Sequence, residues 1–264
     1  MKMVAAARLR KAQDRVQAAR PYALQMQSLM RRIAGAAGEI SHPLLAQRVG
    51  NRLAVVLFTS DRGLCGSYNV NLCRLAMSLL SERSPDEVRL IVFGRKGRDY
   101  MRRRGWAPHA VFAVPSEGGF ADVRPVAGMV RSLFEQNEVD EVDLVFARFV
   151  SPMVQRPAVL KLLPVEPPKP DEEQVSAPTN YIFEPAPAEL LGHLLPRYVD
   201  TQLFQALLEA VASEHGARMT AMSNATSNAS EMIERLTLDL NRARQAGITK
   251  ELTEIVTSAD ALKG

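Results

Sequence analysis

The residues best placed to bind a phosphate group lie in one short segment, Thr59 to Asn69, which reads Thr-Ser-Asp-Arg-Gly-Leu-Cys-Gly-Ser-Tyr-Asn. The segment follows an apolar run and opens a helical pattern, the position where α/β folds often bind phosphate. It matches neither the Gly-x-Gly-x-x-Gly fingerprint nor a Walker loop, so it lacks the lysine that would reach phosphate oxygens. Phosphate binding here is therefore the minor alternative to a structural loop.

Other residue types that commonly do chemistry form no recognisable set. The two cysteines, Cys65 and Cys73, fit neither a redox Cys-x-x-Cys pair nor a zinc-ligand pattern, so we expect buried free thiols in a reducing compartment. The four histidines are widely scattered. No Ser/His/Asp or Cys/His arrangement and no paired carboxylates can be assembled. We expect no catalytic residue, no cofactor site and no metal site in this chain.

Positive charge is concentrated near the N-terminus. From Met1 to Ile40 there are eight basic residues and two acidic ones, although the net charge of the whole chain is only +4. A solvated helix face is one interpretation, and an acidic protein surface or nucleic acid as partner is the other. A second basic cluster, from Phe93 to Arg104, is better explained as a solvated helix face.

Both ends of the chain carry the pattern of a coiled coil, with apolar or small residues at alternating steps of four and three. The N-terminal seam is Ala5, Leu9, Ala12, Val16, Ala19, Ala23, Met26, Met30, Ile33, Ala37 and Ile40. The C-terminal seam is His215, Met219, Met222, Thr226, Ala229, Ile233, Leu236, Leu240, Ala243 and Gly247, and it then shifts by one residue. Pro21 should bend the first helix. A nearly unbroken helix is predicted from Pro187 to Asp260, with a distal part that another protein must cover.

Between the two arms the pattern predicts an α/β domain. Short apolar runs rich in β-branched residues indicate strands at 53–59, 88–93, 110–114, 142–150 and 158–165. Helical stretches at 69–80, 97–104 and 123–136 alternate with the first four strands, which favours a mostly parallel, Rossmann-like sheet. We therefore predict the α/β fold class, with a long two-helix coiled coil bracketing this domain. The predicted parts are an N-terminal coiled-coil helix (1–50), the α/β domain (51–166), a linker and foot segment (167–186) and a C-terminal coiled-coil helix (187–264).

Length and composition set further bounds. The 264 residues, of which 47% are hydrophobic and 23% charged, are typical of a soluble globular protein with one or two domains. No apolar run approaches the roughly 18 residues needed to cross a bilayer. The first residues lack the apolar core of a secretory signal, so we expect the protein to stay on the side of the membrane where it is made.

Three stretches together resemble one family: Met1-Lys-Met-Val-Ala-Ala-Ala-Arg-Leu-Arg-Lys, Ser60-Asp-Arg-Gly-Leu-Cys-Gly-Ser-Tyr-Asn, and Ala243-Arg-Gln-Ala-Gly-Ile-Thr-Lys-Glu-Leu-Thr-Glu-Ile-Val. They are similar to the γ subunit of F-type ATP synthase. The resemblance extends over essentially the whole chain and includes Ser213-Glu-His-Gly-Ala-Arg-Met-Thr-Ala-Met. It implies a central rotor whose terminal helices form an antiparallel coiled coil inside a hexamer of α and β subunits. In this family the chemistry belongs to β, and γ transmits torque from a membrane ring driven by protons, or by Na⁺ in some members.

The resemblance also implies partners and contact residues. Contacts with α and β, or within the coiled coil, are expected at Arg8, Lys11, Arg15, Arg218, Arg244, Gln245, Thr249, Glu251 and Glu254. Contacts of the foot with the membrane c-ring and the small ε subunit are expected at Tyr181, Phe183 and Glu184. The expected location is peripheral, on the cytoplasmic face of the bacterial inner membrane. A polar helix face is the simpler explanation of the helical residues.

One departure from the family and two alternatives remain open. Family members usually carry further residues before the segment that matches Met1 to Lys11, so the sequence is expected to start inside its first helix, with a misassigned start codon, a trimmed sequence and a shortened helix as the alternatives. One alternative function is a nucleotide-binding α/β enzyme in which the helices only dimerise, although the missing phosphate lysine speaks against it. The other is a basic coiled-coil protein that binds nucleic acid, for which no recognition motif is present. We expect no nucleic acid among the partners.

Overall fold

The computed structural model describes residues 2–36, 42–116, 118–165 and 187–261. The chain forms two compact units, Met1–Thr220 and Ala221–Gly264. The first unit contains the sheet, the shorter helices, helix α1 and the beginning of the long helix α5. The second unit contains the remainder of α5, which runs from Pro187 to Ala261 without interruption.

The described elements follow one another in the order that the sequence pattern predicts. The helices are α1 (Lys2–Ala36), α2 (Tyr68–Leu80), α3 (Arg95–Arg102), α4 (Phe120–Glu135) and α5 (Pro187–Ala261), with 3-10 turns η1 (Pro43–Leu45) and η2 (Pro85–Glu87). The strands are β1 (Leu53–Phe58), β2 (Val88–Phe93), β3 (Ala110–Phe112), β4 (Glu141–Phe149) and β5 (Gln155–Leu163). Pro21 lies inside α1, which continues beyond it.

The five strands form one sheet in the order β3-β2-β1-β4-β5. Strands β1 to β4 pair in parallel, and β5 pairs antiparallel with β4 through a short turn. The sheet is therefore mostly parallel, as predicted. The ends of β1, β2 and β3 lie at one edge, and the loops that follow them meet there.

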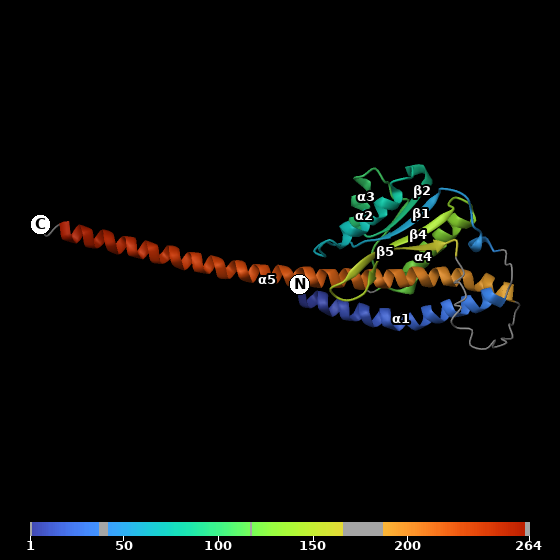
Figure 1. The fold of residues 1–264 in the computed structure, drawn as a ribbon, viewed down its shortest axis with the longest axis horizontal. Coiled ribbons are helices and arrows are strands. Elements are labelled where there is room, and N and C mark those ends of the chain that lie inside the picture. Colours follow the sequence, from blue (N-terminus) through green and yellow to red (C-terminus); the bar gives the residue numbers. More distant parts are fainter. Residues whose placement is uncertain (1, 37–41, 117, 166–186, 262–264) are drawn as a thin grey trace. The chain divides into compact units, whose positions relative to one another are not determined.

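Two apolar cores cover the two faces of the sheet. In β1, Leu53, Val55 and Leu57 pack toward α2 and α3, whereas Ala54, Val56 and Phe58 face the core that includes α1, α4 and α5. Because a core covers each face, every residue of β1 is buried, and its sequence is one continuous apolar run. Figure 1 shows the same layers, with α2 and α3 on one side of the sheet and α4, α5 and α1 on the other.

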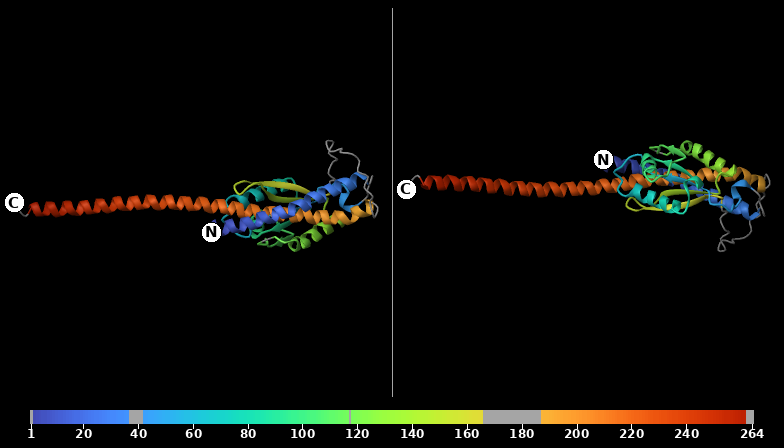
Figure 2. Two further views of the ribbon diagram at one scale, coloured as in Figure 1. Left: turned by 90° about the horizontal axis from the view of Figure 1, so that it is seen from below. Right: turned by 90° about the horizontal axis from the view of Figure 1, so that it is seen from above.

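Helix α1 lies beside the first part of α5 and runs antiparallel to it (Figures 1 and 2). Arg8 lines one cavity with Arg218, whereas Arg20 and Gln27 line another with Gln205 and Glu209. Residues later in α1 therefore lie beside residues earlier in α5. The predicted seam of α1 is the buried face. Its buried members are Ala5, Leu9, Ala12, Ala23, Met26, Met30 and Ile33, with Val16 and Ala19 half-buried.

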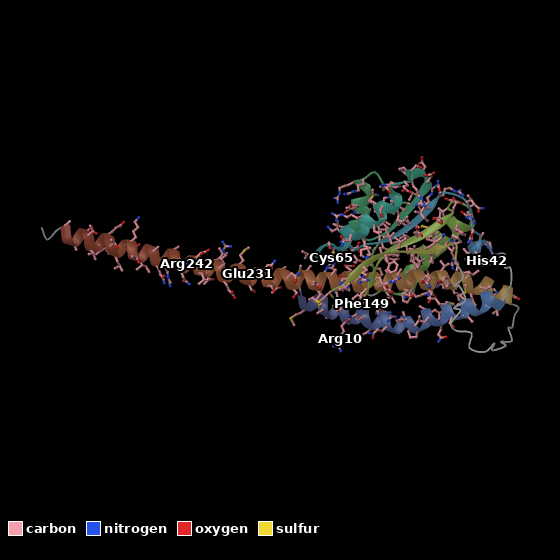
Figure 3. The ribbon with its side chains drawn as sticks, in the orientation of Figure 1. Arg10, His42, Cys65, Phe149, Glu231 and Arg242 are labelled. Atoms are coloured by element: carbon pink, nitrogen blue, oxygen red, sulfur yellow. The ribbon has the colours of Figure 1, made fainter. Side chains whose placement is uncertain are left out.

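The C-terminal seam has a different environment. From Leu191 to Ala212, α5 contributes a row of buried leucine, valine and alanine side chains to the core. From Asn224 onward every described side chain of α5 is exposed, including the predicted seam members Ile233, Leu236 and Leu240. Figure 3 shows side chains such as Glu231 and Arg242 projecting from this part of the helix. The four-part division into 1–50, 51–166, 167–186 and 187–264 stays a prediction, because the two compact units divide the chain inside α5 instead.

A pair of leucine substitutions in α5 tests this difference in burial. Leu207 is fully buried and Leu240 is 68% exposed. Leu207→Ala should lower the free energy of unfolding of the isolated chain by about 2–5 kcal/mol, because it leaves a cavity in the core. Leu240→Ala should change it by about 0.5 kcal/mol or less. Urea unfolding of both variants measures the difference, and equal losses would contradict the burial described.

Candidate functional site at the junction of α5 and the loop after β1

Asp61 holds together the loops at the carboxyl edge of the sheet. Its carboxylate accepts hydrogen bonds from the backbone N–H of Arg95, at 3.0 Å, and from that of Val114, also at 3.0 Å. These residues follow β2 and β3, so one side chain after β1 joins three strand ends. The backbone N–H of Ser60 donates to Oδ1 of Asn69 at 2.9 Å, which closes the loop onto α2.

Two glycines of the basic segment after β2 are explained by the close approach of Thr59. Gly94 has a φ of +94°, and a Cβ there would lie 2.6 Å from the carbonyl oxygen of Thr59. A Cβ on Gly97 would meet the Thr59 hydroxyl at 2.5 Å, and the Gly97 N–H donates to that hydroxyl at 2.9 Å. These two glycines therefore let Thr59 pack closely against the start of α3.

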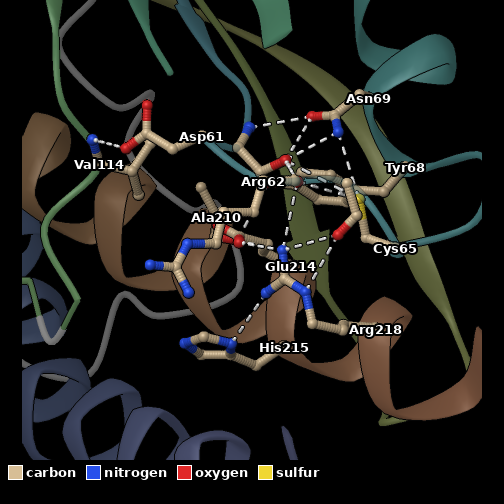
Figure 4. A network of polar contacts seen from close by, with 12 residues as sticks. Asp61, Arg62, Cys65, Tyr68, Asn69, Val114, Ala210, Glu214, His215 and Arg218 are labelled. Atoms are coloured by element: carbon tan, nitrogen blue, oxygen red, sulfur yellow. Dashed lines mark hydrogen bonds and ion pairs between the residues drawn. The ribbon is translucent and has the colours of Figure 1, made fainter. Parts of the chain in front are cut away.

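Arg218 connects α5 to the same loop (Figure 4). Its guanidinium lies 2.6 Å from a carboxylate oxygen of Glu214, one turn earlier in α5. It also donates to the backbone carbonyls of Gly63 and Arg62, each at 3.3 Å. The two charged side chains are largely buried, with exposed fractions of 16% for Arg218 and 11% for Glu214. Solvent and salt therefore screen the attraction within this pair much less than within an ion pair on the surface.

Burial controls the ionisation of the groups around this pair. It raises the pKa of Glu214, and the opposite charge of Arg218 only partly offsets this effect. Burial also lowers the pKa of His215 to about 4, with further lowering by the positive charges of Arg218 and Arg8. His215 is therefore neutral at pH 7, and its Nδ1 can accept from the Arg218 guanidinium at 3.4 Å. The buried Tyr68 hydroxyl donates to the carbonyl of Ala210 at 3.0 Å.

Two cavities flank the junction. Arg8, Lys11 and Arg15 line a cavity of about 340 Å³ together with Ser116. A second cavity of about 270 Å³ is lined by Arg8 and Arg218 and by the loops after β1, β2 and β3. Within the described ranges no group of three or more His, Cys, Asp or Glu side chains could hold a metal ion. The arrangement supplies cationic surface and internal ties, and among its described residues we find no pairing of a nucleophile with a base.

The structure divides the predicted contact residues between the two units. Arg8, Lys11, Arg15 and Arg218 lie in the first unit, around these cavities. Arg218 is bound to its own chain, which favours the interpretation that it holds the helix in place. The second unit carries the other predicted contacts, all on exposed positions of α5: Arg244, Gln245, Thr249, Glu251 and Glu254. Tyr181, Phe183 and Glu184 lie outside the described residues.

Sequence reasoning missed the role of Asp61 and Glu214. Both lie in segments that the pattern singled out, the loop after β1 and the Ser213-Glu-His motif, but 155 residues separate Gly63 from Arg218. Nothing in the spacing indicates that the two segments meet. The phosphate interpretation of the loop loses support, because the carboxylate of Asp61 and the amide of Asn69 bind groups of the same chain.

Comparison with known proteins identifies the family. The family model described as ATP synthase matches residues 1–262. An ATP synthase gamma chain from Desulfitobacterium hafniense is 52% identical over 264 residues, which cover all of this chain and 92% of that protein. The chain belongs to the ATP synthase gamma family. A gamma chain from Pelotomaculum thermopropionicum is 48% identical over the same length, again covering 92% of the relative.

Solved structures agree in fold. The central stalk and c-ring structure of the Tetrahymena thermophila mitochondrial ATP synthase contains a chain with a TM-score of 0.62 and 22% identity, covering 86% of this chain and 97% of that one. A chain of the Euglena gracilis mitochondrial enzyme has a TM-score of 0.61 and 17% identity, covering 99% and 94%. As a gamma chain, the protein is a central-stalk subunit of ATP synthase, a membrane-associated complex. In the described part of the chain, no helix is long and apolar enough to span a membrane.

The pair Glu214–Arg218 makes a prediction about pH. Arg218→Gln leaves the Glu214 carboxylate buried without a cation, so its pKa should rise further above the unfolded value of 4.5. A raised carboxyl pKa costs stability once the pH exceeds the unfolded value, and the full cost is reached above the folded value. The variant should therefore lose on the order of 2–3 kcal/mol at pH 8 and clearly less at pH 4.5.

Urea unfolding of the isolated chain at the two pH values measures this loss. Arg242→Gln is the matched control, because Arg242 pairs with Asp239 on a highly exposed part of α5. It should change stability little at either pH. The double variant Glu214→Gln/Arg218→Gln should abolish the extra pH dependence. An equal loss for Arg218→Gln at pH 4.5 and pH 8 would show that Glu214 is not the cause.

Proposed function

We propose that this chain rotates inside a ring of α and β subunits and transmits torque between a proton-driven membrane ring and the catalytic sites of β. The name of its relatives, ATP synthase gamma chain, supports the assignment to that complex. The Euglena structure is described as one rotational state of F1 with its c-ring, which supports rotation as the mode of action. On this proposal catalysis belongs to β, as the resemblance to the γ subunit family implies.

The exposed apolar seam of the second unit is the observation that carries the proposal. Between Ala221 and Ala261 the large apolar side chains that are more than half exposed are Met232, Ile233, Leu236, Leu238, Leu240, Leu252, Ile255 and Val256. They lie on more than one face of the helix, since Leu238 is two residues, or about 200°, from both Leu236 and Leu240. Exposed apolar side chains in this number mark a surface that binds another protein. A ring of larger subunits around α5 would cover these side chains from several sides.

Charge on the two helices fits a rotating contact. Arg8 and Lys11 are exposed on α1, and the tip of α5 carries Arg244, Glu251 and Glu254. Exposed ion pairs contribute about 1 kcal/mol or less each, so they can break and re-form as the helix turns against its housing. We propose that these residues, with Arg15, Gln245 and Thr249, contact α and β.

The membrane side of the complex completes the proposal. We propose that Tyr181, Phe183 and Glu184 contact the c-ring and the ε subunit. The chain then lies peripherally at the cytoplasmic face of a bacterial inner membrane. The Tetrahymena structure is described as the central stalk together with the c-ring, which supports a contact between these two parts.

Native mass spectrometry of the chain co-expressed with α and β subunits from the same organism tests the central-stalk role directly. The expected result is one copy of this chain in a complex with a six-subunit ring. Leu236→Pro should prevent that assembly, because proline breaks the helix within the exposed seam. A folded chain that never joins the ring would overturn the proposal.

The tip residues give a second prediction. Gln245→Leu or Glu254→Gln should lower the ATPase rate of the assembled complex severalfold, because each removes a polar contact with the ring. Glu234→Gln is a control on the same exposed helix, outside the tip motif. Circular dichroism should show unchanged folding for all three variants. Normal turnover in both tip variants would remove the case for these contacts.

A further inference from the structure

The last turns of α5 in the first unit are held by polar contacts from two directions. On one side are the ties of Ala210, Glu214 and Arg218, and on the other the contacts of Ser213, Gly216 and Thr220. We call these six residues and the groups they touch the helix collar. We propose that the helix collar is the torsional anchor through which torque passes between α5 and the α/β domain. This inference rests on the proposed function.

The first side faces the loop after β1 and the start of α2. Tyr68 donates its hydroxyl to the carbonyl of Ala210 at 3.0 Å. Two turns later Arg218, paired with Glu214, donates to the carbonyls of Gly63 and Arg62. Figure 4 shows these groups converging on one stretch of α5. The three positions are four residues apart, so they form one stripe along the helix.

The second side faces β4 and the turn between β4 and β5. The buried Ser213 hydroxyl donates to the carbonyl of Ala147 at 2.9 Å. Ala147 lies near the end of β4, so this bond joins α5 directly to the sheet. The Thr220 hydroxyl donates to the carbonyl of Pro152 at 3.2 Å.

Gly216 brings this second side into close contact. A Cβ there would lie 3.1 Å from Nε2 of Gln155 and 3.2 Å from the carbonyl oxygen of Pro152. The helix backbone therefore rests directly on the turn that receives Thr220. Gln155 in turn donates to the Pro152 carbonyl at 2.8 Å, which fixes that turn.

The two stripes lie about a third of a turn apart around α5, since each residue advances the helix by about 100°. Contacts at two separate angles resist twisting of the helix in either sense. Hydrogen bonds are directional, whereas apolar contacts are not, so these bonds oppose rotation more sharply than the packing further along α5. Torque that travels along α5 from residues beyond Thr220 meets these directional contacts first.

The second stripe can be weakened with almost no change of shape. In the assembled complex, Ser213→Ala/Thr220→Val removes both hydroxyl contacts. In membrane vesicles, the ATP hydrolysis rate should stay within about twofold of the parent, while the ATP-driven proton gradient falls at least about threefold. Thr237→Val/Ser230→Ala makes the same chemical changes in the second unit at two positions outside the C-terminal seam, and the Thr237 hydroxyl donates to the carbonyl of Ile233 in its own helix at 2.7 Å. This control should pump normally.

Single variants separate an anchor from a merely structural role. Thr220→Ser keeps the hydroxyl, so its proton pumping should equal that of the parent. Thr220→Val keeps the shape of the side chain but loses the hydroxyl, so it should pump less than the parent. Thr220→Val alone also serves if the double variant fails to fold. Pumping and hydrolysis that fall in proportion, or pumping that is unchanged, would overturn the inference. Failure of the parent chain to join α and β would instead overturn the proposed function, so the two failures are distinguishable.

Discussion

Burial of the first part of α5 against the sheet is the interaction on which the rest of the structure depends. Leu191, Leu195, Val199, Leu203 and Leu207 repeat every four residues and are almost fully buried. They give α4 and α1 a shared surface to pack on, because both helices join the same core. Arg131 of α4 reinforces this packing, since its guanidinium lies 2.9 Å from Asp200 of α5. Each fully buried side chain of this kind contributes about 1.5–3 kcal/mol.

The junction at the carboxyl edge of the sheet uses the site where many α/β proteins bind a ligand. Here the loops after β1, β2 and β3 are joined by Asp61, and Arg218 of α5 occupies the adjacent space. Buried polar groups must find partners or lose stability. In this chain those partners come from the protein itself, and the edge of the sheet becomes an attachment point for a helix.

The same helix serves two purposes because its environment changes near Thr220. Before Thr220 the apolar side chains of α5 are buried in the chain's own core. After it, Ile233, Leu236 and Leu240 are exposed, and they belong to the surface that we propose the ring of α and β subunits covers. A subunit that must be held firmly at one end and contacted by changing neighbours at the other fits this division. This division of α5 into a buried part and an exposed part is consistent with the central-stalk role of the gamma family.

The sequence by itself determined the elements and the seams. Short apolar runs rich in β-branched residues predicted all five strands, and helical periodicity predicted the helices, because burial of an element leaves a regular pattern of apolar residues along the chain. The sequence did not determine that Arg218 donates to the carbonyls of Arg62 and Gly63, that Ser213 donates to the carbonyl of Ala147, or that His215 is neutral. The hydrogen bonds join groups that lie 66 to 156 residues apart in the chain, and the neutral His215 results from its burial in the folded protein. Local patterns encode which face of an element is buried, whereas only the tertiary structure decides which polar groups meet once it is buried.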